Sequence, residues 1–310
     1  MGPRVPYPTD YDWGDYDPND LPPGAVVGRP FTVDGNSRMA KSIACGVQDT
    51  HYSQSWKETL DLTISDNITA NKRIGEHWLQ QAEAEHASIA SFARHTLQLM
   101  SIGAPSMLLA ASQEASLDEI KHAKICYGIA SAFLDTDFFP GPLEVTNSMS
   151  QMSIKDIIKS LVQEGCIEET LSAMEARFQA RWTDIPAIKD SLETIAMEET
   201  SHAQLAWNTI SWIIGKYPEE KQFIMETFRE AFKAYWEDSS KHTDTTDSNI
   251  FPVQCGGSSM HRFGLLTNKD KSLIRKAGVK LVIGPVFNEE LKDVRKISRL
   301  IMELDLRNIA

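Results

Sequence analysis

The chain has 310 residues, of which 42% are hydrophobic and 24% charged, and its formal net charge is −12. This composition is typical of a globular protein and excludes collagen-like, low-complexity and wholly disordered chains. The acidic balance repels phosphate backbones and therefore argues against a nucleic-acid partner. The sequence has no run of about eighteen apolar residues, so no membrane span is expected. The four cysteines are scattered and never form CxxC, so we expect reduced thiols and a cytoplasmic location.

The first segment, residues 1–71, has the composition of an extended arm. Residues 1–35 contain seven prolines, and five aspartates precede position 21. Neither a helical nor an alternating apolar pattern is present there, and residues 36–70 have room for one short helix at most.

The second segment, residues 72–215, has apolar residues at helical spacing along most of its length. This pattern predicts four long helices, over about 72–102, 105–134, 153–182 and 186–215. Gly103 and Pro105 separate the first two, Ser153 with Asp156 begins the third, and Pro186 begins the fourth.

The connections between these helices predict an all-α four-helix bundle. The first and second helices are joined tightly, as are the third and fourth, so each pair is expected to be antiparallel. The 135–152 connection is long enough to run the length of the bundle, which makes it the one long crossover of a standard topology. The third segment, residues 216–310, is expected to be a helical extension packed on the bundle, with helices near 218–238, 269–282 and 286–307.

Two similar motifs stand in the second and fourth predicted helices. They are Asp118-Glu119-Ile120-Lys121-His122-Ala123 and Glu198-Glu199-Thr200-Ser201-His202-Ala203. Residues three apart share a helix face, so the Glu and His of each motif point the same way. About 0.6 ExxH pairs are expected by chance in a chain with 22 glutamates and 8 histidines. Carboxylate and imidazole groups that converge on one point are ligands for first-row metals.

A glutamate upstream of each motif completes an internal repeat. Glu85 lies 34 residues before Glu119, and Glu164 lies 35 residues before Glu199. Each is in the middle of the helix that pairs with an ExxH helix, on or near an apolar face where an unliganded glutamate is not expected. Two further glutamates follow Glu164 in the third predicted helix. Glu168 shares the face of Glu164 and is an alternative ligand or a neighbour of the site, whereas Glu169 is expected to be exposed.

A third ExxH pair, Glu83 with His86, lies in the first predicted helix. We expect it at the surface or behind the ligands. Phe92 and Tyr127 are candidates to line a cavity, and the tryptophans are expected to serve packing.

The pattern Glu85, Glu119-x-x-His122, Glu164, Glu199-x-x-His202 resembles the ferritin-like di-iron carboxylate proteins, over about residues 72–215. The resemblance implies two iron ions held by four carboxylates and two imidazoles, with Mn/Fe or two Mn as alternatives. A further likeness is to the bacterial multicomponent hydroxylases, whose motif places an acid just before each ExxH glutamate. It implies that Asp118 and Glu198 hydrogen-bond the far nitrogens of His202 and His122, respectively.

These implications lead to one functional expectation with two alternatives. We expect an oxidoreductase that uses O2 to hydroxylate or desaturate a small organic molecule, because long segments flank the bundle and suit a substrate pocket. The alternatives are a ferroxidase that stores iron and a metal-binding protein without turnover. Peroxide reduction is disfavoured by the absence of a CxxC module. No flavin or nicotinamide motif is present, so electrons are expected from an external donor or reductase, and a homo-oligomer is left open.

Overall fold

The computed structural model of the chain describes residues 29–46, 50–64, 68–150, 152–240, 260–288 and 291–303. Most of these residues are helical, in agreement with the all-α class. The α-helices are α1 Thr50–Ser55, α2 Ile68–Ser101, α3 Ser106–Leu134, α4 Ile154–Ser160, α5 Thr170–Trp182, α6 Pro186–Lys216, α7 Lys221–Ser240, α8 Asn268–Gly278, α9 Gly284–Asn288 and α10 Lys296–Glu303. Among these helices, none is both long enough and apolar enough to be a candidate membrane span.

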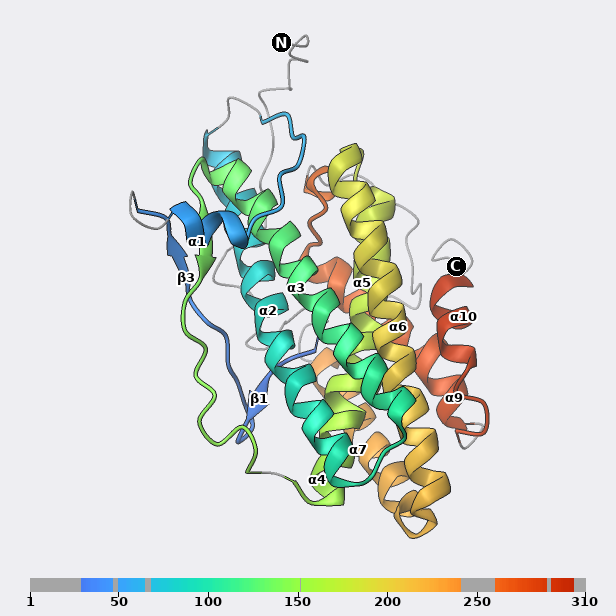
Figure 1. Ribbon diagram of the computed structural model, residues 1–310. Coiled ribbons are helices and arrows are strands. Elements are labelled where there is room, and N and C mark those ends of the chain that lie inside the picture. Colours follow the sequence, from blue (N-terminus) through green and yellow to red (C-terminus); the bar gives the residue numbers. More distant parts are fainter. Residues whose placement is uncertain are drawn as a thin grey trace.

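Four long helical rods lie side by side and form the bundle (Figure 1). Two are α2 and α3, and the fourth is α6. The third rod runs through α4, a π-helical segment, Leu161–Glu169, and α5. The helices α2 and α3 pack against each other along most of their length, as do α5 and α6. The predicted antiparallel pairs are therefore present, and their ends agree with the predicted ranges to within a few residues.

Local chemistry explains where these rods begin and end. Gly103 has φ +68°, the left-handed conformation that ends a helix. The Ser153 side chain accepts a hydrogen bond from the Asp156 amide, and the Asp156 side chain accepts one from the Ser153 amide. This reciprocal cap satisfies backbone donors at the start of α4. Pro186 occupies the first turn of α6, where its missing N–H is not needed.

The long connection, residues 135–150, runs from one end of the bundle to the other (Figure 1). It carries a short strand that the sequence did not predict, and three others precede α1. They are β1 Thr32–Val33, β2 Asn36–Ser37, β3 Ser42–Ala44 and β4 Phe138–Pro140. Each forms an antiparallel pair, β1 with β2 and β3 with β4. The second pair ties the residues before α1 to the crossover.

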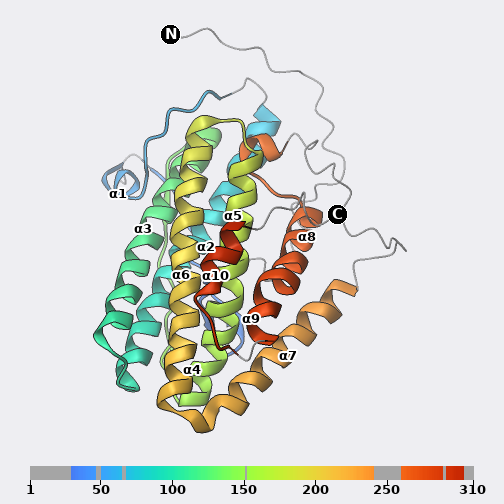
Figure 2. The ribbon, with the colours of Figure 1, turned by 90° about the vertical axis from the view of Figure 1, so that its right-hand side faces the viewer.

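The C-terminal segment contains the helices α7 to α10 and packs against the bundle. In Figure 2, α8 and α10 lie against the face formed by α5 and α6. The prediction of one helix over 286–307 is wrong for its described part. The helix α9 ends at Asn288, Leu291 has φ +60°, and α10 begins only at Lys296. Residues 304–307 lie outside the described residues, as do residues 1–28 of the arm predicted over 1–71.

Short π-helical and 3-10 segments complete the described chain. They are π-helical Leu161–Glu169 and Val279–Ile283, and 3-10 Pro218–Glu220 and His261–Phe263. The largest apolar core is shared by the third and fourth rods and the C-terminal helices, with Trp207, Phe228 and Ile274 fully buried within it. A second core lies between α2, α3, α5 and α6 and contains Trp78 and Ile129. The polar site described next lies among the rods.

Candidate metal centre

Six buried polar side chains from the four rods meet inside the bundle. They are Glu85 of α2, Glu119 and His122 of α3, Glu169 at the end of the π-helical segment, and Glu199 and His202 of α6. Each is at most 2% exposed. Ionisable side chains are rarely buried so completely unless they are paired or bind a cation.

The six side chains form two groups of four that share Glu119 and Glu199. One group adds Glu85 and His122, and the other adds Glu169 and His202. In each group the candidate ligand atoms lie within 4.8 Å of one another. The arrangement has the symmetry of the internal repeat, because each half supplies one Glu–His set and one shared carboxylate.

The two imidazoles direct the same nitrogen inward. His122 Nδ1 lies 3.6 Å from Glu119 Oε2 and 3.4 Å from Glu199 Oε1. His202 Nδ1 lies 3.3 Å from Glu119 Oε1 and 3.9 Å from Glu199 Oε2. The two ring centroids are 5.9 Å apart. Both groups therefore combine one nitrogen with three carboxylates.

The outward nitrogens of the two imidazoles face acids of the opposite ExxH helix. His122 Nε2 lies 2.8 Å from Glu198 Oε2, and His202 Nε2 lies 3.5 Å from Asp118 Oδ2. These are the pairings that the resemblance to the multicomponent hydroxylases implies. Because an ionised carboxylate can only accept, Nε2 carries the proton and Nδ1 keeps its lone pair for a cation. Lys121 contacts both acids, at 2.6 Å from Asp118 and 3.3 Å from Glu198.

Without a cation the cluster holds protons instead. Burial disfavours a charged His202, but Asp118, Glu119 and Glu199 outweigh burial and raise its pKa to about 9. Burial and the neighbouring Glu119 raise the pKa of Glu85 well above its ordinary value. Burial and Glu199 do the same to the pKa of Glu169. Protons thus offset the excess negative charge, and a bound metal ion would displace them.

The donor set fits a pair of first-row metal ions. Each of the six side chains has at least one buried ligand atom with no hydrogen-bond partner among the described residues. These atoms are Glu85 Oε2, both oxygens of Glu119, Glu169 and Glu199, and Nδ1 of His122 and His202. Native proteins rarely leave so many buried polar atoms unsatisfied in one place. Carboxylates with one imidazole per ion suit iron or manganese.

The structure places Glu169 in the cluster and Glu164 outside it. The prediction that Glu169 is exposed is wrong, since it is 0% exposed. Glu164 instead accepts two hydrogen bonds from Arg94 Nη2, at 2.9 and 3.1 Å, and one from Ser160 at 2.7 Å. The segment Leu161–Glu169 is π-helical, with i→i+5 hydrogen bonds, so its side chains do not follow the α-helical period. The α-helical period used for the prediction could not single out Glu169.

Glu168 is expected from the sequence either to replace Glu164 as a ligand or to lie near the site. Its carboxylate accepts a hydrogen bond of 2.5 Å from Arg275 of α8 and belongs to neither ligand group. The face that Glu168 shares with α8 is thus an interface between the bundle and the C-terminal segment.

The aromatic residues and the third ExxH pair that the sequence indicated lie around the cluster. The Phe92 ring meets the His202 ring edge-on, with centroids 5.0 Å apart. Tyr127 faces the other way, and its hydroxyl lies 3.2 Å from Ser42 Oγ of β3. Of the third ExxH pair, Glu83 accepts a 2.7 Å hydrogen bond from the Ser42 amide, and His86 packs on Trp56. This pair therefore holds the segments that precede α2.

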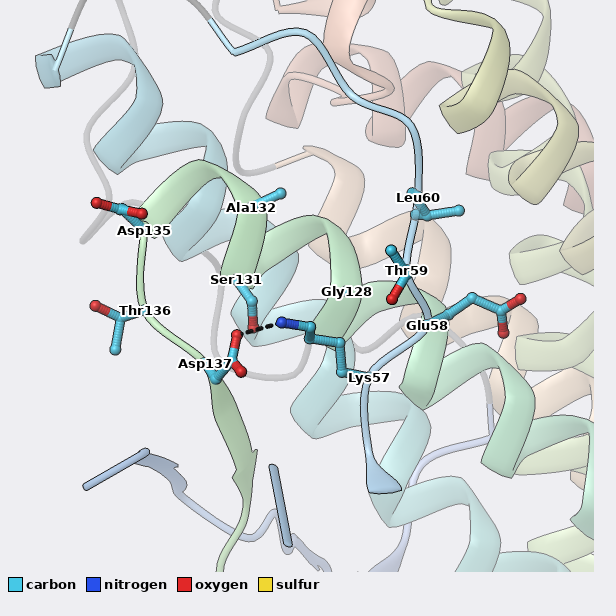
Figure 3. Close-up of a pocket in the computed structure, with 10 residues that line it drawn as sticks. All are labelled: Lys57, Glu58, Thr59, Leu60, Gly128, Ser131, Ala132, Asp135, Thr136 and Asp137. Atoms are coloured by element: carbon cyan, nitrogen blue, oxygen red, sulfur yellow. Dashed lines mark hydrogen bonds and ion pairs between the residues drawn. The ribbon is translucent and has the colours of Figure 1, made fainter. Parts of the chain in front are cut away.

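A surface pocket lies on the outer side of α3 and contains no predicted ligand. Figure 3 shows its lining, which comes from the segment before α2 and from the end of α3. The lining residues are Lys57, Glu58, Thr59, Leu60, Gly128, Ser131, Ala132, Asp135, Thr136 and Asp137. Lys57 pairs with Asp137 at 2.5 Å. This pocket is separate from the buried cluster.

Comparison with known proteins leaves the site to be judged on its own geometry. The chain has no significant match to any protein-family model, to any curated protein or to any solved structure.

Proposed function

We propose that this chain is a ferritin-like di-iron carboxylate protein that uses O2 to oxidise a small organic substrate. One observation carries the proposal: two buried groups of one imidazole and three carboxylates share Glu119 and Glu199. Two bound iron ions would supply the electrons that O2 reduction requires.

The protein's own residues would hold and shield that chemistry. Glu85 and His122 would bind one ion, Glu169 and His202 the other, and the shared carboxylates would join the two. Glu198 and Asp118 would fix the ring orientations of the two histidines. The edge of Phe92 against His202 would keep water from that side of the cluster.

The flanking segments favour an organic substrate over iron storage. The helices α8 and α10 cover the third and fourth rods, and their core is continuous with that of the bundle. A storage subunit has no need of such a layer, whereas substrate enzymes often build their pockets where elements meet. An external electron donor remains part of the proposal.

Iron loading and oxygen uptake test the function. The apo protein is titrated anaerobically with Fe(II), exposed to O2, and assayed for iron per chain and O2 consumed. The proposal expects two irons per chain and no further uptake, followed by O2 consumption that candidate substrates increase. Continued mineral growth beyond two irons would instead support storage, and stable binding without O2 consumption would support a non-catalytic metal protein.

A matched pair of variants tests the ligands. Glu119→Ala removes a carboxylate that both groups share, so metal content is expected to fall to near zero while the far-UV circular dichroism stays helical. Glu114→Ala changes an exposed glutamate of the same helix and is expected to keep the full metal content. Equal metal content in both variants would reject the assignment.

A further inference from the structure

The segment 29–33, here called the strap, is fixed along α2 beside the cluster. Three α2 side chains donate hydrogen bonds to its carbonyl oxygens: Ser88 to Arg29, Ser91 to Pro30 and Arg94 to Thr32. The buried Phe31 ring lies 5.0 Å below the Arg94 guanidinium. The backbone of the strap therefore has a defined position on the bundle.

This position places the side chain of Arg29 next to the candidate metal centre. Arg29 is 1% exposed. Its guanidinium carbon lies 5.1 Å from the centre of the Phe92 ring, and that ring contacts His202. On the other side, a Cβ atom placed on Gly165 would lie 3.7 Å from Arg29 Nη2. Gly165 belongs to the π-helical segment that ends at Glu169, so the Arg29 side chain lies between the Phe92 ring and the rod that carries Glu169.

The acids near Arg29 determine whether its positive charge acts on the cluster. Glu164, which lies outside the cluster, is already paired with Arg94 through two hydrogen bonds. Arg29 Nε has no hydrogen-bond partner among the described residues. Among the acids that act electrostatically on Arg29, Glu164 has the larger effect and Glu169 follows it. A buried guanidinium is costly unless negative charge offsets it, and Glu169 belongs to a cluster of four carboxylates.

We propose that Arg29 affects the metal affinity and the redox potential of the metal centre. Its fixed positive charge offsets part of the negative charge of the four carboxylates. This inference rests on the proposed function. Four carboxylates balance two divalent ions, and oxidation of each ion to the trivalent state adds one positive charge. A nearby fixed cation opposes that addition, so Arg29 favours the reduced state and weakens the binding of divalent ions.

Three variants separate charge from packing. Arg29→Met removes the charge but keeps a long side chain, and Arg29→Lys keeps the charge. Arg38→Met is the control, because Arg38 belongs to the same N-terminal region but hydrogen-bonds the carbonyls of Glu144 and Thr146 in the crossover. Mn(II) affinity is measured by competition with a chelator, and the midpoint potential of the iron-loaded protein by spectroelectrochemistry.

The sign of the change decides the outcome. For Arg29→Met we expect roughly tenfold tighter Mn(II) binding. We also expect the midpoint potential of the iron-loaded protein to fall by about 59 mV for each tenfold shift of the one-electron equilibrium towards the oxidised state. Arg29→Lys and Arg38→Met should match the parent protein. Weaker Mn(II) binding in Arg29→Met, or unchanged binding and potential, would overturn the proposal and assign Arg29 to packing.

Failure of a variant to fold and failure of the parent protein to bind metal also have defined meanings. If Arg29→Met does not fold, Arg29→Gln is the second uncharged variant, and failure of both to fold would also reject the proposal in favour of a structural role. If the parent protein binds no metal, the proposed function fails with it. If the parent binds metal but the Arg29 variants change nothing, only this inference fails.

Discussion

Glu164 and Glu169 are five residues apart in the same π-helical segment, yet their surroundings differ completely. Glu169 lies among carboxylates and an imidazole with both its oxygens unsatisfied. Glu164 has a full set of donors, with Arg94 as its ion-pair partner. These surroundings favour a ligand role for Glu169 and a structural role for Glu164.

Replacing each of them by glutamine should separate these roles. Glu169→Gln is expected to lose about one of the two ions, because one group loses an anionic oxygen ligand. Glu164→Gln is expected to keep both ions but to unfold more easily, by about 3 kcal/mol, because Arg94 is left buried without its counter-charge. Elemental analysis and urea titration measure the two effects. Loss of metal in Glu164→Gln with retention in Glu169→Gln would reverse the assignment.

His77 of α2 illustrates a different use of burial. It is 4% exposed, and neither ring nitrogen has a hydrogen-bond partner among the described residues. Burial, with a smaller contribution from Lys271, lowers its pKa to about 3. The folded protein therefore keeps His77 neutral in a range of pH where the unfolded chain protonates it.

This depressed pKa should make stability fall in acid. Below the unfolded pKa of about 6.5 the unfolded state binds one more proton than the folded state, so the free energy of unfolding decreases as the pH falls towards 3. Between pH 7 and pH 5 the His77 contribution is about 2 kcal/mol. Urea unfolding at both pH values should show His77→Leu losing that much less than the parent protein. A control change at the exposed His51 should leave the parent's loss intact, and equal losses in His77→Leu and the parent would contradict the prediction.

At the scale of elements, the helices follow from local chemistry that the sequence displays. Apolar spacing predicts α2, α3 and α6, and residues such as Gly103 and Ser153 mark their ends. The π-helical segment could not be predicted in this way, because an i→i+5 hydrogen-bond pattern leaves no mark in the apolar period. The short strands β1 to β4 depend on pairing between distant segments, which two or three residues do not encode.

Gly128 of α3 is required by a close approach between two elements. A Cβ atom there would overlap the carbonyl oxygen of Glu58, whose amide donates to the Lys124 carbonyl. The segment 57–60 thus rests directly on the helix, as Figure 3 shows. No side chain fits between them.

Alanine at two helical glycines should therefore have opposite effects. Gly128→Ala is expected to destabilise the protein by about 1–3 kcal/mol, because the 57–60 segment must move. Gly215→Ala, in the last turn of α6 with nothing within 4 Å of the new methyl group, is expected to stabilise by up to about 1 kcal/mol through helix propensity. Chemical denaturation checks both. A neutral Gly128→Ala would show that the contact is loose.

At the scale of the whole molecule, the cluster requires all four rods, and each rod contributes at least one of its six side chains. The sequence repeat predicted five of the six cluster residues, because α2, α3 and α6 are regular helices and their ligands follow the α-helical period. The sixth depends on the π-helical segment, and the approach of Arg29 depends on how the strap lies across α2. The apolar spacing shows neither arrangement. The π-helical hydrogen bonds are local but leave no mark in the apolar period, and the strap is held by contacts between segments far apart in the chain.

The C-terminal segment is tied to the bundle by an ion network that centres on Arg275 of α8. Its guanidinium donates to Glu175 of α5 at 3.0 Å and to Glu168 at 2.5 Å. Glu175 is 1% exposed, so removal of Arg275 would leave its carboxylate buried without this ion-pair partner. Arg275→Met should destabilise the folded protein by about 2 kcal/mol, between the values for exposed and fully buried pairs.

The same experiment distinguishes a specific tie from a general loss of surface charge. Arg299→Met removes an exposed ion pair with Glu303 within α10 and should change the stability by less than about 1 kcal/mol. Because one apolar core spans α5, α6 and the C-terminal helices, Arg275→Met should shift tryptophan fluorescence and circular dichroism transitions together. Two separate transitions in the parent protein would show that the C-terminal segment unfolds by itself, and an unchanged midpoint in Arg275→Met would show that the network does not hold it.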